Sequence, residues 1–402
     1  MDSITDKIIA QNTTYGARNY KPLPVVLERG EGAFLWDVEG NRYLDMLSSY
    51  SAVNQGHCHP RIVSAMIDQA KELTLTSRAF HNANLGAFCE KLAQLCGLDR
   101  VLPMNSGAEA VETAIKAARK WGYLHKNVPD DQAEIIVCND NFHGRTTTII
   151  SCSTEEAYRH QFGPFTPGFK AVPFGDATAL EAAITPNTVA FLVEPIQGEA
   201  GIIVPPTGYL KFASDICKAH NVLLIADEIQ VGLGRTGTMF CCDHDEVKPD
   251  AYILGKALSG GCYPVSAVVS REDVLGVFAP GEHGSTFGGN PLAAAIGMAA
   301  IDVIQSEHLA VRSLELGHLA INRLKDAKLS CVRDIRGKGL LIGVELKQSV
   351  GGARKPCEAL MKRGVLCKET HEHVIRLAPP LVVEEKDLLV AVDEVIAVLT
   401  DL

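Results

Sequence analysis

Three segments of the chain place chemically useful groups where an apolar run gives way to a loop or a helix. Lys256 follows the run AYILG, and its amine is a nucleophile that can condense with an aldehyde. Asp227 and Glu228 end the run VLLIADE, so their carboxylates emerge where the run stops. The segment NSGA (105–108) precedes a helical pattern, and the free N–H groups of a helix start can bind a phosphate.

An amine, a carboxylate and a phosphate-binding helix start are together the groups that pyridoxal 5′-phosphate requires. The lysine forms a Schiff base with the aldehyde of this cofactor, the carboxylate keeps its pyridine nitrogen protonated, and the helix start holds its phosphate. Each group alone has a more ordinary explanation, because a lysine after a strand is usually a surface residue and an aspartate there is often a helix cap. Their combination and order favour the cofactor.

Two other patterns suggest sites that we reject. Residues 232–237 read GLGRTG, the spacing of a dinucleotide-binding loop, but the following TMFCCDHDEV lacks the helical periodicity that such a loop requires. The pairs His57/His59 and His371/His373 have no evident third or fourth ligand for a metal ion. Packing or surface roles are the more ordinary explanation for these histidines, and we expect no metal site.

These chemical groups can meet only in a fold that brings the ends of several strands together. The sequence pattern in the middle of the chain predicts such a fold. Helical patterns such as AEAVETAIKAARKWGY (108–123) alternate with short apolar runs. The runs are EIIVC (134–138), VAFLVE (189–194), VLLIADE (222–228), AYILG (251–255) and SAVVS (266–270). Continuous apolar strands separated by helices imply an α/β fold with a mostly parallel sheet that helices cover on both faces. In such sheets, ligands bind beyond the carboxyl ends of the strands.

The character of the chain differs towards its two ends. After residue 290 a long helical stretch leads into the hairpin-like KLSCVRDIRGKGLLIGVEL and then HVIRLAPPLVV, which suggests a smaller α+β domain. The opening VVLERGEGAFLWDVEGNRYLDML alternates like a small antiparallel sheet with a turn at Glu39-Gly40. We therefore expect three parts: an N-terminal segment (1–44) packed with the small domain, a large cofactor-binding domain (45–290) and a C-terminal small domain (291–402).

Composition and charge argue against several classes of protein. Hydrophobic residues make up 47% of the 402 residues and charged residues 21%, an ordinary globular balance. The net charge of -10 gives no general attraction to nucleic acid. No run reaches the ~18 apolar residues that a membrane span needs, and the N-terminus resembles neither a secretory signal nor a transit peptide.

The twelve cysteines include no CxxC, which favours buried thiols. We expect a cytoplasmic protein, or one from which a leader has been removed.

Six segments together resemble the ω-aminotransferases of the fold-type I superfamily of pyridoxal-phosphate enzymes. They are NSGAEAVETAIKAARKWGY, NFHGRT, VEPIQGEAG, ADEIQVGLGRTG, LGKALSGG and GEHGSTFGGNPLAAA. Three more, YGARNYKPLPVVLERGEG, SSYSAVNQGHCHP and RLAPPL, resemble the branch of the family that acts on ornithine. The resemblance implies that the terminal amino group of ornithine is transferred to 2-oxoglutarate. Acetylornithine and 4-aminobutyrate are the alternative donors, used by related enzymes.

The resemblance also implies roles for residues around the cofactor. Lys256 would hold it and carry a proton during the transfer, and Asp227 would pair with the pyridinium. Ser285 and Thr286 would reach the phosphate of the neighbouring subunit, so we expect a homodimer or a larger homo-oligomer. The cofactor-binding residues that the resemblance implies are Gly107, Ala108, Phe142, His143, Asp227, Gln230, Lys256, Ser285 and Thr286.

For the substrate, the resemblance implies a charge switch. Tyr20 and Arg145 would hold the α-amino and α-carboxylate groups of ornithine. Glu199 would pair with Arg376 while ornithine is bound and release it for the α-carboxylate of 2-oxoglutarate, since a buried unpaired arginine is costly. Tyr50 would favour a free α-amine over an acylated one, because the acetylornithine and 4-aminobutyrate enzymes tend to carry an aliphatic residue there.

A catalytically retired relative that serves as a binding or scaffold protein is the alternative from a different class. Lys256, Asp227 and Arg145 are all intact, which favours an active enzyme. Failure to bind the cofactor would restore the scaffold interpretation.

Overall fold

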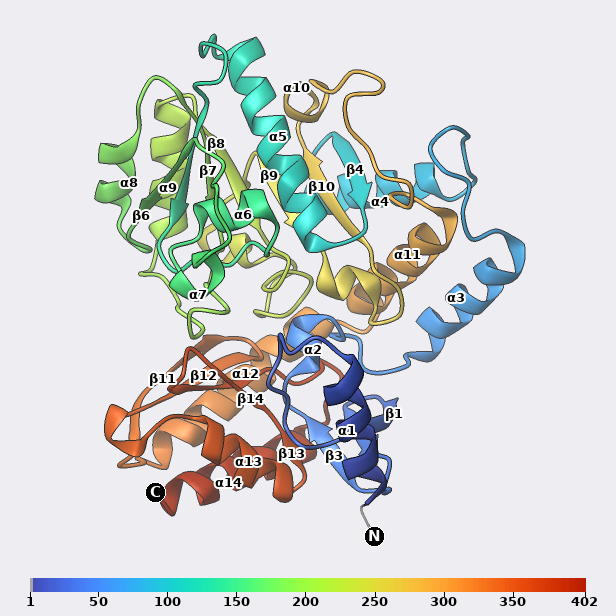
Figure 1. Ribbon diagram of the computed structural model, residues 1–402, viewed down its shortest axis with the longest axis vertical. Helices are drawn as coiled ribbons and strands as arrows, with labels where there is room; N and C mark the ends of the chain where they lie inside the picture. The colour runs from blue at the N-terminus through green and yellow to red at the C-terminus, as the bar shows by residue number, and fades with distance from the viewer. Residues whose placement is uncertain (1–2) are drawn as a thin grey trace.

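A seven-stranded sheet forms the centre of the larger part of the molecule in the computed structural model, which describes residues 3–402 (Figure 1). Its strands lie in the order β4-β10-β9-β8-β7-β5-β6. The five from β9 to β6 are parallel, whereas β10 runs antiparallel to both β4 and β9. The strands are β4 (Arg100–Met104), β5 (Glu134–Cys138), β6 (Phe169–Val172), β7 (Thr188–Val193), β8 (Leu223–Asp227), β9 (Ala251–Leu254) and β10 (Ser266–Ser270).

Both faces of this sheet are buried. Successive strand residues point to opposite faces, and in β5 Ile135 and Val137 enter one apolar core while Ile136 and Cys138 enter the other. This double burial explains why the strand runs are apolar without alternation. One face is covered by α5 (Gly107–His125), α6 (Thr147–Cys152) and α10 (Glu272–Leu275). The other is covered by α4 (Leu85–Cys96), α8 (Ala177–Ala183), α9 (Tyr209–Ala219) and α11 (Pro291–Ser306).

A smaller part of the molecule lies below the large sheet in Figure 1 and contains two four-stranded sheets. One consists of β1 (Leu27–Glu31), β2 (Phe34–Asp37), β3 (Arg42–Asp45) and β13 (Val365–Leu366). The other consists of β11 (Val332–Lys338), β12 (Leu341–Leu346), β15 (Val374–Leu377) and β14 (Lys368–Thr370). Strand β13 pairs with β3, so the C-terminal region completes a sheet that begins near the N-terminus.

Helices pack around these small sheets and join them to the large one. The C-terminal helices of this part are α12 (Leu309–Asp326), α13 (Arg354–Lys362) and α14 (Glu385–Thr400). The remaining helical elements are α1 (Ile4–Tyr15), α2 (Ser48–Ser51), α3 (Pro60–Glu72), α7 (Glu156–Arg159) and the 3₁₀ turns η1 (Cys241–Asp245), η2 (Lys256–Ser259) and η3 (Gln348–Val350).

The predicted fold class is confirmed, with differences in detail. All five predicted runs form strands of the large sheet, but β10 is antiparallel, which an apolar run cannot reveal because both directions bury it equally. Strands β4 and β6 were not predicted. The first contains Pro103, which argues against a strand, and the second is only four residues long. Helix α11 belongs to the predicted C-terminal domain (291–402), but it contacts α3 and α4, which belong to the predicted large domain (45–290). The domain boundaries after residues 44 and 290 stay predictions.

The short element α2 has an unusual backbone. Its four residues all have positive φ, with values of 50° for Ser48, 47° for Ser49, 61° for Tyr50 and 72° for Ser51. The turn closes through a 2.9 Å hydrogen bond from the Ala52 N–H to the Ser48 carbonyl. Each left-handed residue that carries a Cβ costs roughly 1–2 kcal/mol, so four in succession require support from their surroundings.

Within residues 3–402, no single helix has both the length and the apolar character needed to cross a membrane. The bent pair of α11 and α12 passes that test only when the two helices are taken together.

Candidate active site

A cavity of about 160 Å³ opens at the carboxyl edge of the large sheet. Asp227 ends β8, Lys256 follows β9, and Phe142 and His143 follow β5. Because the carboxyl ends of parallel strands meet at one edge, residues far apart in sequence converge there. The lining residues are Gly107, Ala108, Phe142, His143, Gly144, Glu194, Asp227, Ile229, Gln230, Val231 and Lys256.

Lys256 enters the cavity from the first residue of η2. Its backbone has a φ of 41°, a left-handed conformation at the point where the chain leaves β9. Burial lowers the pKa of its amine from 10.5 to about 8, and the charges of Glu199 and Asp227 only partly oppose that shift. A lowered pKa increases the fraction of neutral amine near pH 7, and the neutral amine is the form that attacks an aldehyde.

Asp227 is held from two directions. Its Oδ2 lies 2.7 Å from Nδ1 of His143, and its Oδ1 accepts a 3.1 Å hydrogen bond from the N–H of Ile229. Burial opposes protonation of His143, but the neighbouring Asp227 carboxylate outweighs burial and raises the histidine pKa. His143 and the Ile229 N–H therefore fix the orientation of the Asp227 carboxylate at the wall of the cavity.

The start of α5 offers free donors to the cavity. Ser106 and Glu109 form a capping box, in which each side chain accepts the backbone N–H of the other. The N–H groups of Gly107 and Ala108 donate to no atom of the described residues. A Cβ on Gly107 would lie 2.9 Å from Cδ1 of Ile229, so this position suits glycine. Free N–H groups at a helix start are suited to an anion.

Arg376 and Glu199 form an ion pair next to this cavity, in which the arginine is buried and the glutamate side chain is 25% exposed. Nη1 of Arg376 donates to Oε1 of Glu199 at 2.9 Å, and Gln230, which lines the cavity, donates to the same oxygen at 3.0 Å. The Arg376 side chain is 2% exposed. Burial raises the pKa of Glu199, but the Arg376 charge outweighs burial and lowers it to about 2. Nη2 of Arg376 also donates to the Gly198 carbonyl and to Oγ1 of Thr370.

Gly198 is close-packed against this cluster. A Cβ at that position would lie 1.7 Å from Oε1 of Gln230. Any larger residue would therefore displace Gln230, and with it the second donor to Glu199. The same Oε1 of Gln230 is buried and has no hydrogen-bond partner among the described residues.

Of the side chains that the resemblance assigns to the substrate, Tyr50 contacts this pair directly. The Cζ of Arg376 is 5.2 Å from the centre of the Tyr50 ring. Arg145 lies over Phe142 and Tyr158, 5.6 and 4.7 Å from the two ring centres, and forms no ion pair with any residue from 3 to 402. Tyr20 is 73% exposed. An exposed guanidinium without a carboxylate partner can accept one from a ligand.

Ser285 and Thr286 lie outside the cavity lining. Ser285 accepts a 2.8 Å hydrogen bond from Nδ2 of Asn105, just before the helix start, and Thr286 is exposed. The structure thus brings the other assigned cofactor residues to the cavity and leaves these two at its margin. Their contact with a neighbouring subunit stays a prediction.

Glu194 is a cavity residue that sequence reasoning missed. Its Oε2 accepts the N–H of Phe142 at 2.9 Å, its Oε1 accepts the N–H of Gly198 at 3.4 Å, and burial raises its pKa to about 7. It ends the run VAFLVE in the way that Asp227 ends VLLIADE, which is the sequence signal that could have identified it. Glu228, by contrast, turns away from the cavity and accepts the N–H groups of Cys241 and Cys242.

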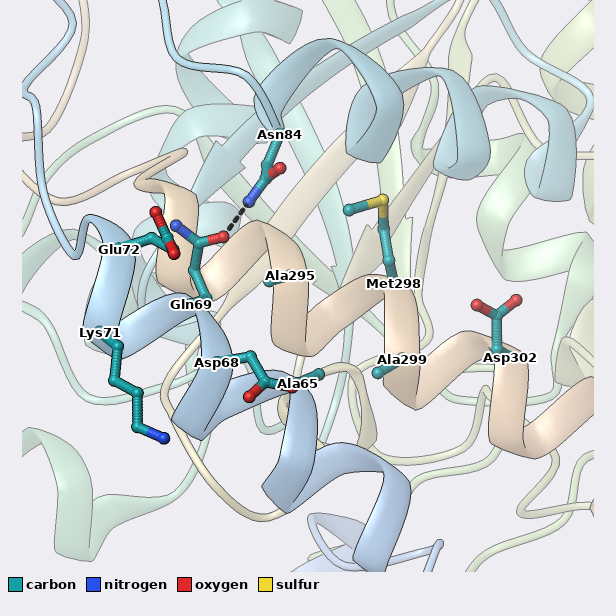
Figure 2. Close-up of a pocket in the computed structure, with 10 residues that line it drawn as sticks. All are labelled: Ala65, Asp68, Gln69, Lys71, Glu72, Asn84, Ala295, Met298, Ala299 and Asp302. Carbon is teal, nitrogen blue, oxygen red and sulfur yellow. Dashed lines mark hydrogen bonds between the residues drawn. The ribbon is translucent and has the colours of Figure 1, made fainter.

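A larger, open hollow of about 690 Å³ lies between α3 and α11 (Figure 2). Its base is formed by small side chains of α11, and Asn84 donates a 2.7 Å hydrogen bond to Gln69 at one end. Charged side chains such as Lys71 and Asp68 surround it. It contains none of the residues described above, and we assign the chemistry to the smaller cavity.

Comparison with known proteins gives consistent matches over the whole chain. The family "Aminotransferase class-III" matches residues 15–399. An ornithine aminotransferase of Halalkalibacterium halodurans is 58% identical over 399 residues, which cover 99% of this chain and 100% of that protein. The crystal structure of an ornithine aminotransferase from Toxoplasma gondii ME49 has a TM-score of 0.98 at 46% identity, covering 100% of this chain and 96% of that one. An acetylornithine aminotransferase from Elizabethkingia anophelis has a TM-score of 0.90 at 48% identity, with both chains covered completely, 100% each.

Proposed function

The chain belongs to the class-III aminotransferase family, and from that premise we propose that it transfers the terminal amino group of L-ornithine to 2-oxoglutarate. The products are glutamate 5-semialdehyde and glutamate. The observation that carries the proposal is the ion pair of the buried Arg376 with Glu199, which Gln230 links to the cavity that contains Lys256. Full-length identity of 57–59% to ornithine aminotransferases supports it.

Class-III aminotransferases use pyridoxal 5′-phosphate, and the cavity has groups that fit it. The free N–H groups of Gly107 and Ala108 would take its phosphate, and the unpartnered Oε1 of Gln230 would meet a polar group of the ring. Asp227 would face the ring nitrogen. When bound, the cofactor supplies an electron-accepting pyridinium ring. The Phe142 ring would then cover one of its faces.

Lys256 would perform two tasks in this cavity. Its amine, a larger fraction of which is neutral near pH 7 because of the lowered pKa, would hold the cofactor between turnovers. During the transfer, its Nζ would take a proton from the substrate carbon and deliver it to the cofactor. Lys256 projects from the first residue of the short 3₁₀ turn η2, which places its side chain in the cavity.

The Arg376–Glu199 pair would select the two substrates in turn. With Glu199 in place, the positive charge of the Arg376 guanidinium is neutralised. A donor with a cationic terminal amine is therefore not repelled by a like charge. The α-carboxylate of the donor would bind Arg145, which has no ion pair within residues 3–402. When 2-oxoglutarate arrives, its α-carboxylate would replace Glu199 on Arg376 and its distal carboxylate would bind Arg145.

We also propose that the active unit is a homodimer in which Ser285 and Thr286 complete the neighbouring site. Thr286 is exposed at the margin of the helix start that offers N–H groups to a phosphate. Next to it, Phe287 is 46% exposed, and an aromatic ring in that position is suited to a subunit contact.

The alternative donors are N-acetylornithine and 4-aminobutyrate, and the 48% identity to an acetylornithine aminotransferase keeps the first in consideration. Tyr50 favours ornithine, because its phenol lies beside Arg376 where an acyl group would be crowded. The deciding experiment compares kcat/KM for the three donors with 2-oxoglutarate. A preference for N-acetylornithine or 4-aminobutyrate would contradict the proposal, and turnover by Lys256→Ala would contradict the assignment of the catalytic lysine.

A further inference from the structure

The left-handed turn Ser48–Ser51 contains Tyr50, and neighbouring side chains stabilise this turn through hydrogen bonds. Asp45, which is buried, accepts the N–H of Leu47 at 2.8 Å and the N–H of Ser48 at 2.9 Å through Oδ1. These two bonds hold the residue before the turn and the first residue of positive φ, Ser48. An ordinary right-handed turn here would point the Tyr50 side chain in another direction, since the direction of a Cβ depends on φ and ψ.

His57 fixes Asp45 from the opposite side. Its Nε2 lies 2.7 Å from Oδ2 of Asp45, and the histidine side chain is 15% exposed. The His57 backbone exchanges two hydrogen bonds with Gly32, and a Cβ on Gly30 would lie 2.9 Å from the histidine side chain. These contacts fix the position of His57 against the N-terminal sheet. The contact of His57 with Asp45 in turn fixes the orientation of the Asp45 carboxylate.

The same turn is hydrogen-bonded to Ala378, the residue that follows the strand carrying Arg376. Oγ of Ser48 donates to the Ala378 carbonyl at 2.6 Å, and the Ala378 N–H donates to the Met46 carbonyl at 2.7 Å. Ala378 lies two residues after Arg376, so the backbone segments that present Tyr50 and Arg376 are joined. Their side chains meet with the Arg376 Cζ 5.2 Å from the Tyr50 ring centre.

We propose that Asp45 and His57 are positioning residues for donor selectivity, because they hold the left-handed turn that keeps the Tyr50 ring against Arg376. This inference rests on the proposed function, in which Tyr50 distinguishes a free α-amine from an acylated one. Neither residue lines the cavity, so neither touches the reacting groups. Their effect acts through the turn, on substrate binding rather than on the chemical step.

The test measures the ratio of kcat/KM for ornithine to that for N-acetylornithine in the holoenzyme. His57→Gln and Asp45→Asn are each expected to lower this ratio about tenfold, because a hydrogen bond to a charged group is lost from a rigid site. The change should appear in KM for ornithine, with kcat within about twofold of wild type. His59→Gln is the matched control, since His59 also faces a carboxylate, Glu307 at 3.1 Å, but does not contact the turn.

Ser49→Gly provides the rescue. Ser49 is exposed and has a φ of 47°, and glycine adopts this conformation without a Cβ penalty. The double variant Asp45→Asn/Ser49→Gly should recover most of the lost ratio, which a general folding defect would not allow. If Asp45→Asn does not fold, His57→Gln carries the test alone.

Hydrogen exchange of the segment 47–52 gives a readout that does not depend on turnover. The amides of Leu47 and Ser48 should exchange at least about tenfold faster in His57→Gln than in wild type or His59→Gln, because Asp45 then loses its orientation. Absence of ornithine turnover in the wild type would refute the proposed function and leave this readout intact. An unchanged donor ratio or unchanged exchange in His57→Gln would overturn the inference.

Discussion

Replacing Glu199 by glutamine tests the central electrostatic feature of the site. The substitution keeps the size of the side chain and an oxygen for Arg376, but it removes the negative charge. Glu199 has its pKa lowered from 4.5 to about 2, chiefly because the Arg376 charge outweighs burial. A shift of this size corresponds to roughly 3 kcal/mol, and breaking one partner of a buried ion pair costs about 3–5 kcal/mol. We therefore expect Glu199→Gln to lower the free energy of unfolding by about 3 kcal/mol at pH 7.

Urea unfolding of the holoenzyme at one fixed protein concentration would measure this loss. The matched control is Glu394→Gln, since Glu394 accepts a hydrogen bond from Arg363 at the same 2.9 Å, but that pair is 43% and 34% exposed. Solvent screening limits such a surface pair to about 0–1 kcal/mol. The two pairs share the distance and the partner types and differ chiefly in the burial of the arginine, which is 2% exposed for Arg376 and 43% for Arg363. Equal losses in the two variants would refute the reasoning.

The pH dependence gives a second check with a defined sign. A carboxylate whose pKa is lowered on folding contributes stability that is fully present above its unfolded pKa of 4.5 and is lost as the pH falls towards about 2. The difference between wild type and Glu199→Gln should therefore be largest above pH 4.5 and should shrink on acidification below it. In the donor assay, the same variant should lose activity with ornithine more than with glutamate, since only the cationic donor needs Arg376 to be neutralised.

Three further substitutions test other features of the cavity. His143→Phe should weaken cofactor affinity about tenfold, because the Asp227 carboxylate loses its 2.7 Å hydrogen-bond partner; an absorbance titration measures the affinity. Gly198→Ala should lower stability by about 1–3 kcal/mol and displace Gln230, because the new Cβ would lie 1.7 Å from its Oε1; thermal unfolding and cofactor titration measure the two effects. Lys256→Met should stabilise the cofactor-free protein by up to about 3 kcal/mol below pH 8, because burial lowers the lysine pKa from 10.5 to about 8. The unfolded chain binds the extra proton between these pH values, so the advantage of the variant should vanish as the pH rises to 10.5.

Each of these expectations has a control or a contradicting result. Unchanged cofactor affinity in His143→Phe would mean that the N–H of Ile229 alone orients Asp227. Gly284→Ala is the control for Gly198→Ala, since a Cβ there meets no atom within 4 Å and should leave stability unchanged. A Lys256→Met protein that is less stable than wild type at pH 7 would mean that the lysine is well solvated in the absence of cofactor.

Local sequence patterns determined the scaffold and the chemically active strand ends. The runs that end at Asp227 and before Lys256 are apolar without alternation because their strands are buried on both faces, and that burial can be read from neighbouring residues alone. The capped start of α5 is equally local, since Ser106 and Glu109 are three residues apart. For this reason the lysine, the carboxylate and the helix start could be identified together from the sequence.

The tertiary structure decided which distant groups meet and in what geometry. The pair Arg376–Glu199 joins residues 177 positions apart, and the sequence suggested it only through a family resemblance. The antiparallel direction of β10 and the inward position of Glu194 depend on how whole elements pack. So does the left-handed turn at Tyr50, because serine and tyrosine have no intrinsic preference for positive φ. Short-range periodicity encodes which face of an element is buried, whereas pairing, direction and strain are fixed only when distant elements pack against one another.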